Sequence, residues 1–216
     1  HGIKPQNHLT KALDKFSTPT NRKELKRFLG MAGFYRHFIQ NYAKLAHPLN
    51  TLTSDNVPFA WTKDCENAFN IIKEKLSSKP VLAFPQIGEK FVVEVDCIDF
   101  AVGGVLSQMG PDKCIHPVPY MSVSLQPAQR KWCTHSKEAY ALLQATRKWH
   151  MYLIVQSFVL NSDQNPLVYI REKKDPRGKF ATWIAELDEF DYVIEYISGK
   201  NNLKADVLSR NKSALY

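Results

Sequence analysis

Hydrophobic positions recur at helical spacing in the first third of the chain. Two runs, over residues 21–48 and 63–80, bring apolar side chains back every three or four positions, which predicts helices. Asn21 and Glu24 form the pattern of a capping box at a helix start, and Pro48 is predicted to end the first run. The second run places five apolar side chains on one helical face: Cys65, Ala68, Phe69, Ile72 and Leu76.

After position 80 the pattern changes from helical spacing to alternation. In "KFVVEVD" we expect Phe91, Val93 and Val95 on one side of a strand, and Asp96 on the other side with Val92 and Glu94. The segments "VLAFP", "FAVGGVLSQ" and "IHPVPYMSVS" are predicted to be strands of an antiparallel run. A glycine pair in the middle segment, at 103 and 104, would allow a close backbone approach or a bulge.

The last part of the chain alternates between helix and strand. It reads as a long helix "THSKEAYALLQATRKWHMYL", a strand "SFVLNSD", a helix "DPRGKFATWIAELDEF", a strand "DYVIEYI" and a final helix "NNLKADVLSR". These elements predict an α/β fold, a mixed sheet flanked by helices, preceded by a small mainly helical region. We place the boundary near Ser78, which gives domains 1–78 and 79–216.

Charge is uneven along the chain. The net charge is +8; residues 1–80 carry 13 Lys and Arg against 6 Asp and Glu, whereas residues 81–216 carry 16 against 15. A basic first part suggests a polyanionic partner that docks there, although a solvated basic face would give the same excess. The side chains we expect on a phosphate backbone are Arg22, Lys23, Lys26, Arg27 and Arg36. A helical bundle with a charged exterior is the other interpretation of this segment.

Two features bear on cellular location. No apolar run is long enough for a membrane span. The four cysteines show no metal-binding spacing, so we expect reduced thiols in an intracellular protein of a cytoplasmic particle or the nucleus, with one disulfide left open.

Four acids stand at element ends, where a sheet-based site would need them. Asp96 ends a strand, Glu138 is in the long helix, Asp163 follows a strand and Asp206 is on the final helix. Carboxylates that converge repel one another unless cations lie between them, and all-oxygen ligands favour Mg²⁺ or Mn²⁺. Two such ions, roughly 3.5–4 Å apart, could support phosphodiester hydrolysis.

Each of these acids also has a structural interpretation. Asp163 could cap a turn, Glu138 could favour its helix N-terminus, and Asp206 could pair with Arg210. Asp96 is the hardest to explain in this way, because its strand reads as buried on both sides. The neighbouring loop acid Asp99 is the less favoured candidate.

Several segments resemble one known family in the same order along the chain. "VDCIDFAVGGVLSQ", "THSKEAYALLQATRKWHMYL", "SDQNPL" and "ADVLSR" are similar to the ribonuclease H domain of Gypsy-type LTR retrotransposon polyproteins. Upstream, "ELKRFLGMAGFYRHFIQNYAKLAHPLNTL" and "FAWTKDCENAFNIIKEKLSSKPVLAFP" resemble the thumb and connection segment of reverse transcriptase in the same polyproteins. We therefore expect the chain to be a piece of a longer protein.

The resemblance implies a function. Asp96, Glu138, Asp163 and Asp206 would be the catalytic ligands of two Mg²⁺ or Mn²⁺ ions, and Tyr196 would have a site role, unless it is a core strand aromatic. The implied enzyme is a ribonuclease H, an endonuclease that hydrolyses the RNA strand of RNA/DNA hybrids. Its partners would be the hybrid and the upstream polymerase domain, with no membrane. The paired catalytic aspartates of the polymerase are absent, so DNA synthesis is not expected.

The chain departs from the family pattern at two places. It has "DCID" where the family has Asp-Ala-Ser, and "DQNPL" puts Gln164 in place of a histidine. These changes motivate an alternative: a weak or inactive retrotransposon-derived module, kept by a host genome to bind nucleic acid or protein. Retention of all four acids favours the enzyme.

Overall fold

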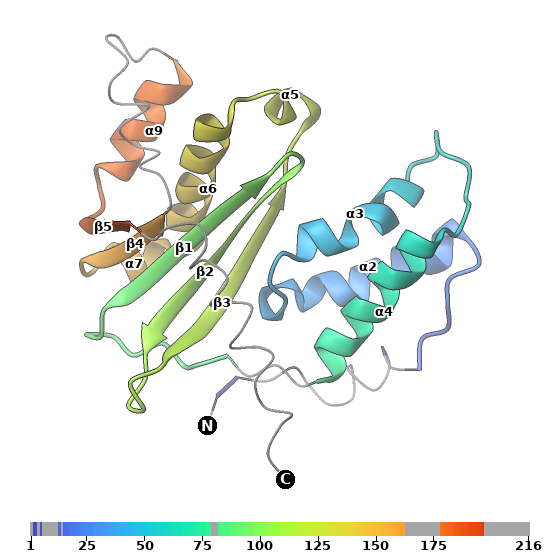
Figure 1. Ribbon diagram of the computed structural model, residues 1–216, viewed down its shortest axis with the longest axis horizontal. Coiled ribbons are helices and arrows are strands. Elements are labelled where there is room, and N and C mark those ends of the chain that lie inside the picture. The colour runs from blue at the N-terminus through green and yellow to red at the C-terminus, as the bar shows by residue number, and fades with distance from the viewer. Residues whose placement is uncertain are drawn as a thin grey trace.

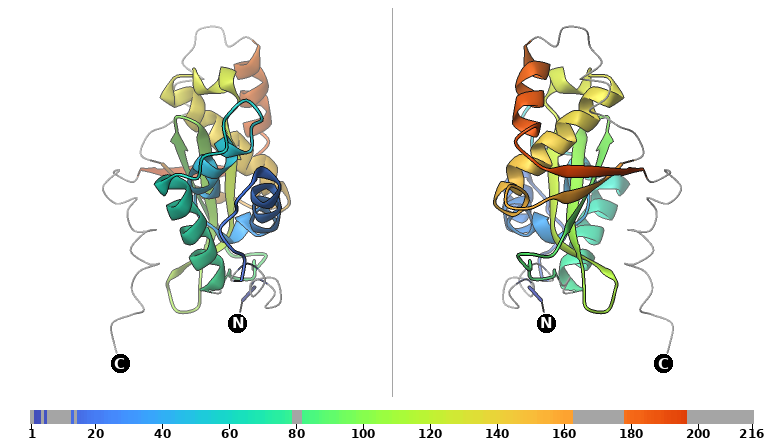
Figure 2. Two further views of the ribbon diagram at one scale, coloured as in Figure 1. Left: turned by 90° about the vertical axis from the view of Figure 1, so that its right-hand side faces the viewer. Right: turned by 90° about the vertical axis from the view of Figure 1, so that its left-hand side faces the viewer.

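A five-stranded sheet lies between two sets of helices in the computed structural model (Figure 1). The structure describes residues 2–3, 5, 13, 15–78, 82–162 and 178–196. On one side of the sheet are α2, α3 and α4, and on the other are α6 and α9, an arrangement that the two side views also show (Figure 2). This layering confirms the predicted fold class.

The sheet is mixed, as the alternation predicted. Its strands are β1 (Phe91–Ile98), β2 (Ala101–Met109), β3 (Ile115–Ser124), β4 (Phe158–Ser162) and β5 (Tyr192–Tyr196). Their order is β3-β2-β1-β4-β5, with β1, β2 and β3 antiparallel and β4 parallel to both β1 and β5. The central strand β1 therefore has one antiparallel and one parallel neighbour.

The structure describes several helices after β3, of which α6 and α9 lie on one face of the sheet (Figure 1). They are α5 (Pro127–Arg130), α6 (Thr134–Lys148), α7 (His150–Leu153) and α9 (Lys179–Leu187). The longest, α6, buries Leu142 and Leu143 against Phe91 and Val93 of β1. Burial of alternate β1 residues confirms the predicted alternation and assigns that face of β1 to α6.

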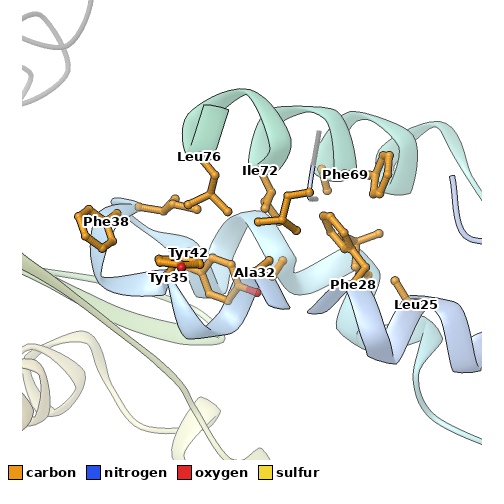
Figure 3. Close-up of a cluster of buried hydrophobic side chains, with 14 of the residues drawn as sticks. Leu25, Phe28, Ala32, Tyr35, Phe38, Tyr42, Phe69, Ile72 and Leu76 are labelled. Carbon is orange, nitrogen blue, oxygen red and sulfur yellow. The ribbon is translucent and has the colours of Figure 1, made fainter. Parts of the chain in front are cut away.

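The helical region consists of α2 (Arg22–Phe34), the 3₁₀ turn η1 (Arg36–Phe38), α3 (Tyr42–Leu52) and α4 (Lys63–Ser77). Asn21 caps α2 as predicted, because its Oδ1 accepts a hydrogen bond from the Glu24 backbone N–H at 3.0 Å. Phe28 and Phe69 meet with ring centroids 4.5 Å apart in the core between α2 and α4 (Figure 3). The apolar face predicted for residues 63–80 is the buried face of α4.

Three expectations about element limits are wrong. Pro48 lies inside α3, which continues to Leu52 because Leu49 and Leu52 are buried in the helical core. The segment "VLAFP" forms no strand in its described part, where Leu82 makes an isolated bridge with Ile3. The long helix ends at Lys148 and is followed by the separate α7. The final helix expected around Asp206 lies outside the described residues.

The buried residues form two main clusters. One belongs to the helical region and the other to the sheet with α6 and α9. The side chain of Tyr120, on β3, packs against the helical cluster, so the two cores meet at the sheet face. The boundary near Ser78 stays a prediction; Ser78 is the C-cap of α4.

The four cysteines lie among the described residues, where none of them forms a disulfide. Within the described ranges, no helix is long and apolar enough to cross a membrane.

Candidate functional site

Asp96 stands in a row of residues that crosses three strands. The strand register pairs Asp96 with Gly103 on β2, and Gly103 with Ser122 on β3. We call these three residues the Asp96 row. The neighbours of Asp96 along β1, Val95 and Cys97, pack with α6 residues, so Asp96 belongs to the opposite face. That face carries the helical region (Figure 1).

The first turn of α3 sits directly on the Asp96 row. The Ala43 backbone N–H donates a hydrogen bond of 2.8 Å to Ser122 Oγ. A Cβ built on Gly103 would lie 2.7 Å from Asn41 Oδ1, so a larger residue there would have to displace the Asn41 side chain. Asn41 itself has a left-handed backbone, with φ at 54°, a conformation that asparagine tolerates better than most residues. Asn41 and Lys44 line a pocket together with Asp96.

Glu138 projects from α6, the helix that covers the other face of β1. Its side chain is 13% exposed, and its Oε2 lies 3.7 Å from His135 Nδ1. The adjacent Lys137 is buried, with its Nζ 3.5 Å from an oxygen of the fully exposed Asp99. The structure thus places Asp96 and Glu138 on two elements that pack together, β1 and α6, with Asp96 on the face of β1 that is turned away from α6.

The other two predicted ligands, Asp163 and Asp206, lie outside the described residues. Near the first of them, β4 pairs with β1 through Glu94 and Asn161, and Asn161 Nδ2 donates to Glu94 Oε1 at 3.1 Å. The backbone of Tyr196 ends β5 opposite Ser162. Among the described residues no group of three or more His, Cys, Asp or Glu could hold a metal ion. The four-acid site therefore stays a prediction.

The predicted basic surface divides into two kinds of side chain. Arg22 donates a hydrogen bond of 3.2 Å from Nε to the Ser54 carbonyl, and a second from Nη2 to the Val57 carbonyl. This arginine ties α2 to the loop after α3. The other four are exposed on the helical region: Lys23, Lys26, Arg27 and Arg36.

Burial and charge perturb several groups between the helical region and the sheet. Burial raises the pKa of Tyr42 to about 12, with Arg36 opposing the shift. It also raises the pKa of Tyr120, helped by the negative charge of Glu94. These two phenols, from α3 and β3, are therefore neutral at physiological pH.

The pocket residues contributed by the helical region were not anticipated from the sequence. Asn41 and Lys44 precede Asp96 by more than fifty positions, and no spacing rule joins them to it. The glycine pair in β2 was the one available signal, since it indicated a close approach without naming the partner.

Residues 61–160, from just before α4 through most of β4, match the family model described as an RNase H-like domain found in reverse transcriptase. Residues 61–160 are therefore similar to RNase H-like domains found in reverse transcriptase, and the sheet and its helices have the RNase H-like fold. The match begins within the helical region, ahead of the predicted boundary near Ser78. The matched segment therefore includes α4 of the helical region as well as strands of the sheet.

Curated relatives extend the similarity of this RNase H-like chain to almost its full length. It is 35% identical over 212 residues to a retrovirus-related Pol polyprotein from transposon 297 of Drosophila melanogaster, which covers 98% of this chain and 20% of that protein. It is 36% identical over 209 residues to the transposon Tf2-3 polyprotein of Schizosaccharomyces pombe, covering 95% and 16%. The chain therefore spans about a fifth of the length of these relatives.

Solved structures share the fold. The foamy viral protease-reverse transcriptase dRH in complex with double-stranded DNA matches with a TM-score of 0.73 at 18% identity, over 91% of this chain and 35% of that one. The foamy viral protease-reverse transcriptase in complex with an RNA/DNA hybrid matches with a TM-score of 0.70 at 18% identity, over 90% and 27%. The predicted resemblance to retrotransposon polyproteins is confirmed, while the Gypsy-type subgroup stays a prediction.

Proposed function

We propose that this chain is the RNase H part of a retrotransposon reverse transcriptase, a metal-dependent endonuclease that hydrolyses the RNA strand of RNA/DNA hybrids. The observation that carries the proposal is the position of Asp96. It lies near the end of the central strand of an RNase H-like sheet, exposed, beside the parallel strand β4. An exposed carboxylate at this strand end can be reached by a cation from solvent.

The strand register supports a second ligand next to Asp96. Glu94 pairs with Asn161 in parallel strands, and Asp96 and Asp163 each follow two positions later in the sequence. On this sequence relation we propose Asp163 as the second ligand. Glu138 would contribute from α6, and Asp206 would be the fourth acid.

These acids suit a hard divalent cation. All the proposed ligands are carboxylates, the donor set that Mg²⁺ and Mn²⁺ prefer, and Glu138 is already mostly removed from solvent. Bound ions would supply an activated water and stabilise the leaving 3′ oxygen. The protein's own part is to hold the acids on rigid elements, and α6 packed on β1 provides that rigidity.

Substrate binding falls to the positive charge of the helical region. The exposed side chains of Lys23, Lys26, Arg27 and Arg36 would contact phosphates of the hybrid, whose recognition as RNA depends on 2′-hydroxyl groups. The upstream polymerase domain of the same polyprotein would be the second partner.

The proposal predicts that Asp96→Asn abolishes cleavage of a labelled RNA/DNA hybrid in Mg²⁺ and in Mn²⁺. The loss should exceed the roughly 10- to 100-fold cost of removing a residue that merely supports a metal ligand. Asp99→Asn is the matched control, because Asp99 is a fully exposed acid three positions away. The control should keep its activity, and circular dichroism should show both variants folded. Cleavage by Asp96→Asn at the wild-type rate would refute the assignment.

The two sequence departures favour a second candidate, a binding module without nuclease activity. It predicts a folded wild-type chain that binds the hybrid but does not cut it. A thermal melt with and without Mg²⁺ separates the candidates further, since a formed acid cluster should raise Tm when the cation binds the native state.

A further inference from the structure

The pocket beside Asp96 is built from both parts of the chain. Asp96 and Ser122 come from the sheet, whereas Asn41 and Lys44 come from the first turn of α3 and its N-cap. The nuclease function proposed above uses only the sheet side of this pocket. The helical side adds the ammonium group of Lys44 and the side-chain amide of Asn41 to this pocket.

Contacts between α3 and the sheet hold the helical side of the pocket in place. The hydrogen bond from the Ala43 N–H to Ser122 Oγ holds the start of the helix. One turn further on, the ring of His47 stacks on Phe100 of the β1–β2 turn, with centroids 4.0 Å apart and an interplanar angle of 19°. These two contacts lie along one helix and seat it on the sheet, with Lys44 in the turn between them.

The chemistry of the pocket suits a phosphodiester. Lys44 is the cationic side chain among the lining residues, and it is exposed, so a ligand from solvent can reach it. Ser122 Oγ already accepts the Ala43 N–H, which leaves its own proton to donate. A phosphate that approaches a carboxylate needs donors and positive charge on its remaining oxygens, and the lysine, amide and hydroxyl groups supply both.

We propose that Lys44 binds a phosphate of the substrate strand beside Asp96, so that the helical region contributes directly to the nuclease pocket. This inference rests on the proposed function. It assigns to the helical region a role in positioning the strand that is cut, in addition to its general attraction for nucleic acid. The simpler alternative is that Lys44 is a solvated surface lysine, and the experiment is designed to separate the two.

The test compares Lys44→Ala with Lys75→Ala in the full chain. Lys75 is an exposed lysine in the last turn of α4 and is not among the pocket residues, so the control removes the same charge elsewhere. The first readout is hybrid binding in EDTA at several salt concentrations, which needs neither metal nor cleavage. We expect Lys44→Ala to weaken binding about tenfold and to reduce the salt slope by about one, and Lys44→Arg to restore much of both.

The second readout is cleavage in Mg²⁺. Lys44→Ala should raise KM, or lower kcat/KM, by at least the factor lost in binding, while Lys75→Ala should match the wild type. If both variants bind and cleave alike, the inference is wrong. It is also wrong if Lys44→Ala lowers cleavage with an unchanged salt slope, because Lys44 would then act on Asp96 instead of on a phosphate. A wild type that binds without cutting would refute the proposed function, and the binding readout would still decide the role of Lys44.

Discussion

Arg22 and Lys23 are neighbours on α2, yet their side chains have different surroundings. The Arg22 guanidinium donates to two carbonyl groups of the loop after α3, whereas Lys23 is exposed. In the sequence, their positive charge alone placed both among the side chains expected on a phosphate backbone. The structure separates a side chain that holds the helical region together from one that is available to a partner.

Arg22→Ala is therefore expected to act on stability. Removing the guanidinium leaves the Ser54 and Val57 carbonyls without this donor, which should lower the free energy of unfolding by about 1–3 kcal/mol. Lys23→Ala should change stability by less than about 0.5 kcal/mol. Urea denaturation of both variants checks this, and equal stabilities would contradict the assigned difference.

The glycine pair of β2 shows how one element meets several others. Gly103 makes room for the helical region, and a Cβ on Gly104 would lie 3.0 Å from the Glu94 carbonyl oxygen and 3.4 Å from the Trp149 ring. The two successive glycines thus serve opposite faces of the strand. Their sequence predicted a close approach, and the structure shows two, with different partners.

At the scale of elements we predict opposite effects for two glycine substitutions. Gly104→Ala should destabilise the protein, because the backbone of β1 and a buried tryptophan would have to move to fit a methyl group. Gly30→Ala on α2 should stabilise it by about 0.5–1 kcal/mol, since nothing lies within 4 Å and alanine favours the helix. Thermal unfolding of the two variants measures both signs. A stabilised Gly104→Ala protein would show that β1 can move aside.

Over the whole molecule, two histidines lie where the helical region meets the rest of the chain. Burial lowers the pKa of His37, helped by Lys148 and Arg36, and burial also lowers the pKa of His47, helped by Arg130. The positive charges of Lys148 and Arg130, both from the sheet side, disfavour the protonated forms of the two histidines. The association between the two parts therefore prefers neutral histidines.

This preference predicts a pH dependence. Since the folded pKa values lie below the ordinary value of about 6.5, the unfolded chain binds more protons in that range. The contribution of the two neutral histidines to the free energy of unfolding is complete above about pH 6.5. It is lost as the pH falls toward their lowered pKa values. Urea denaturation between pH 8 and 5.5 should show the free energy of unfolding decreasing with falling pH. His47→Gln should reduce the slope, and an unchanged slope in both His37→Gln and His47→Gln would refute the prediction.

The sequence by itself determined the elements and the candidate acids. Period-two alternation in "KFVVEVD" identified β1 and put Asp96 opposite the face of Phe91 and Val93, because side-chain direction along a strand follows from local geometry. The buried face of α4 followed from helical spacing for the same reason. The rule that a proline ends a helix failed at Pro48. The helix α3 continues beyond it because Leu49 and Leu52 are buried in the core.

Only the tertiary structure decided which surface the helical region covers. Its first α3 turn reaches the Asp96 row through Gly103 and Ser122, residues that follow Asn41 by more than sixty positions. Such a contact depends on the twist of the sheet and on the mutual fit of two cores, and neither leaves a periodic pattern in the chain. The sequence therefore identified Asp96 as the acid of the pocket. Only the packing of the helical region on the sheet showed that Lys44 lies beside it.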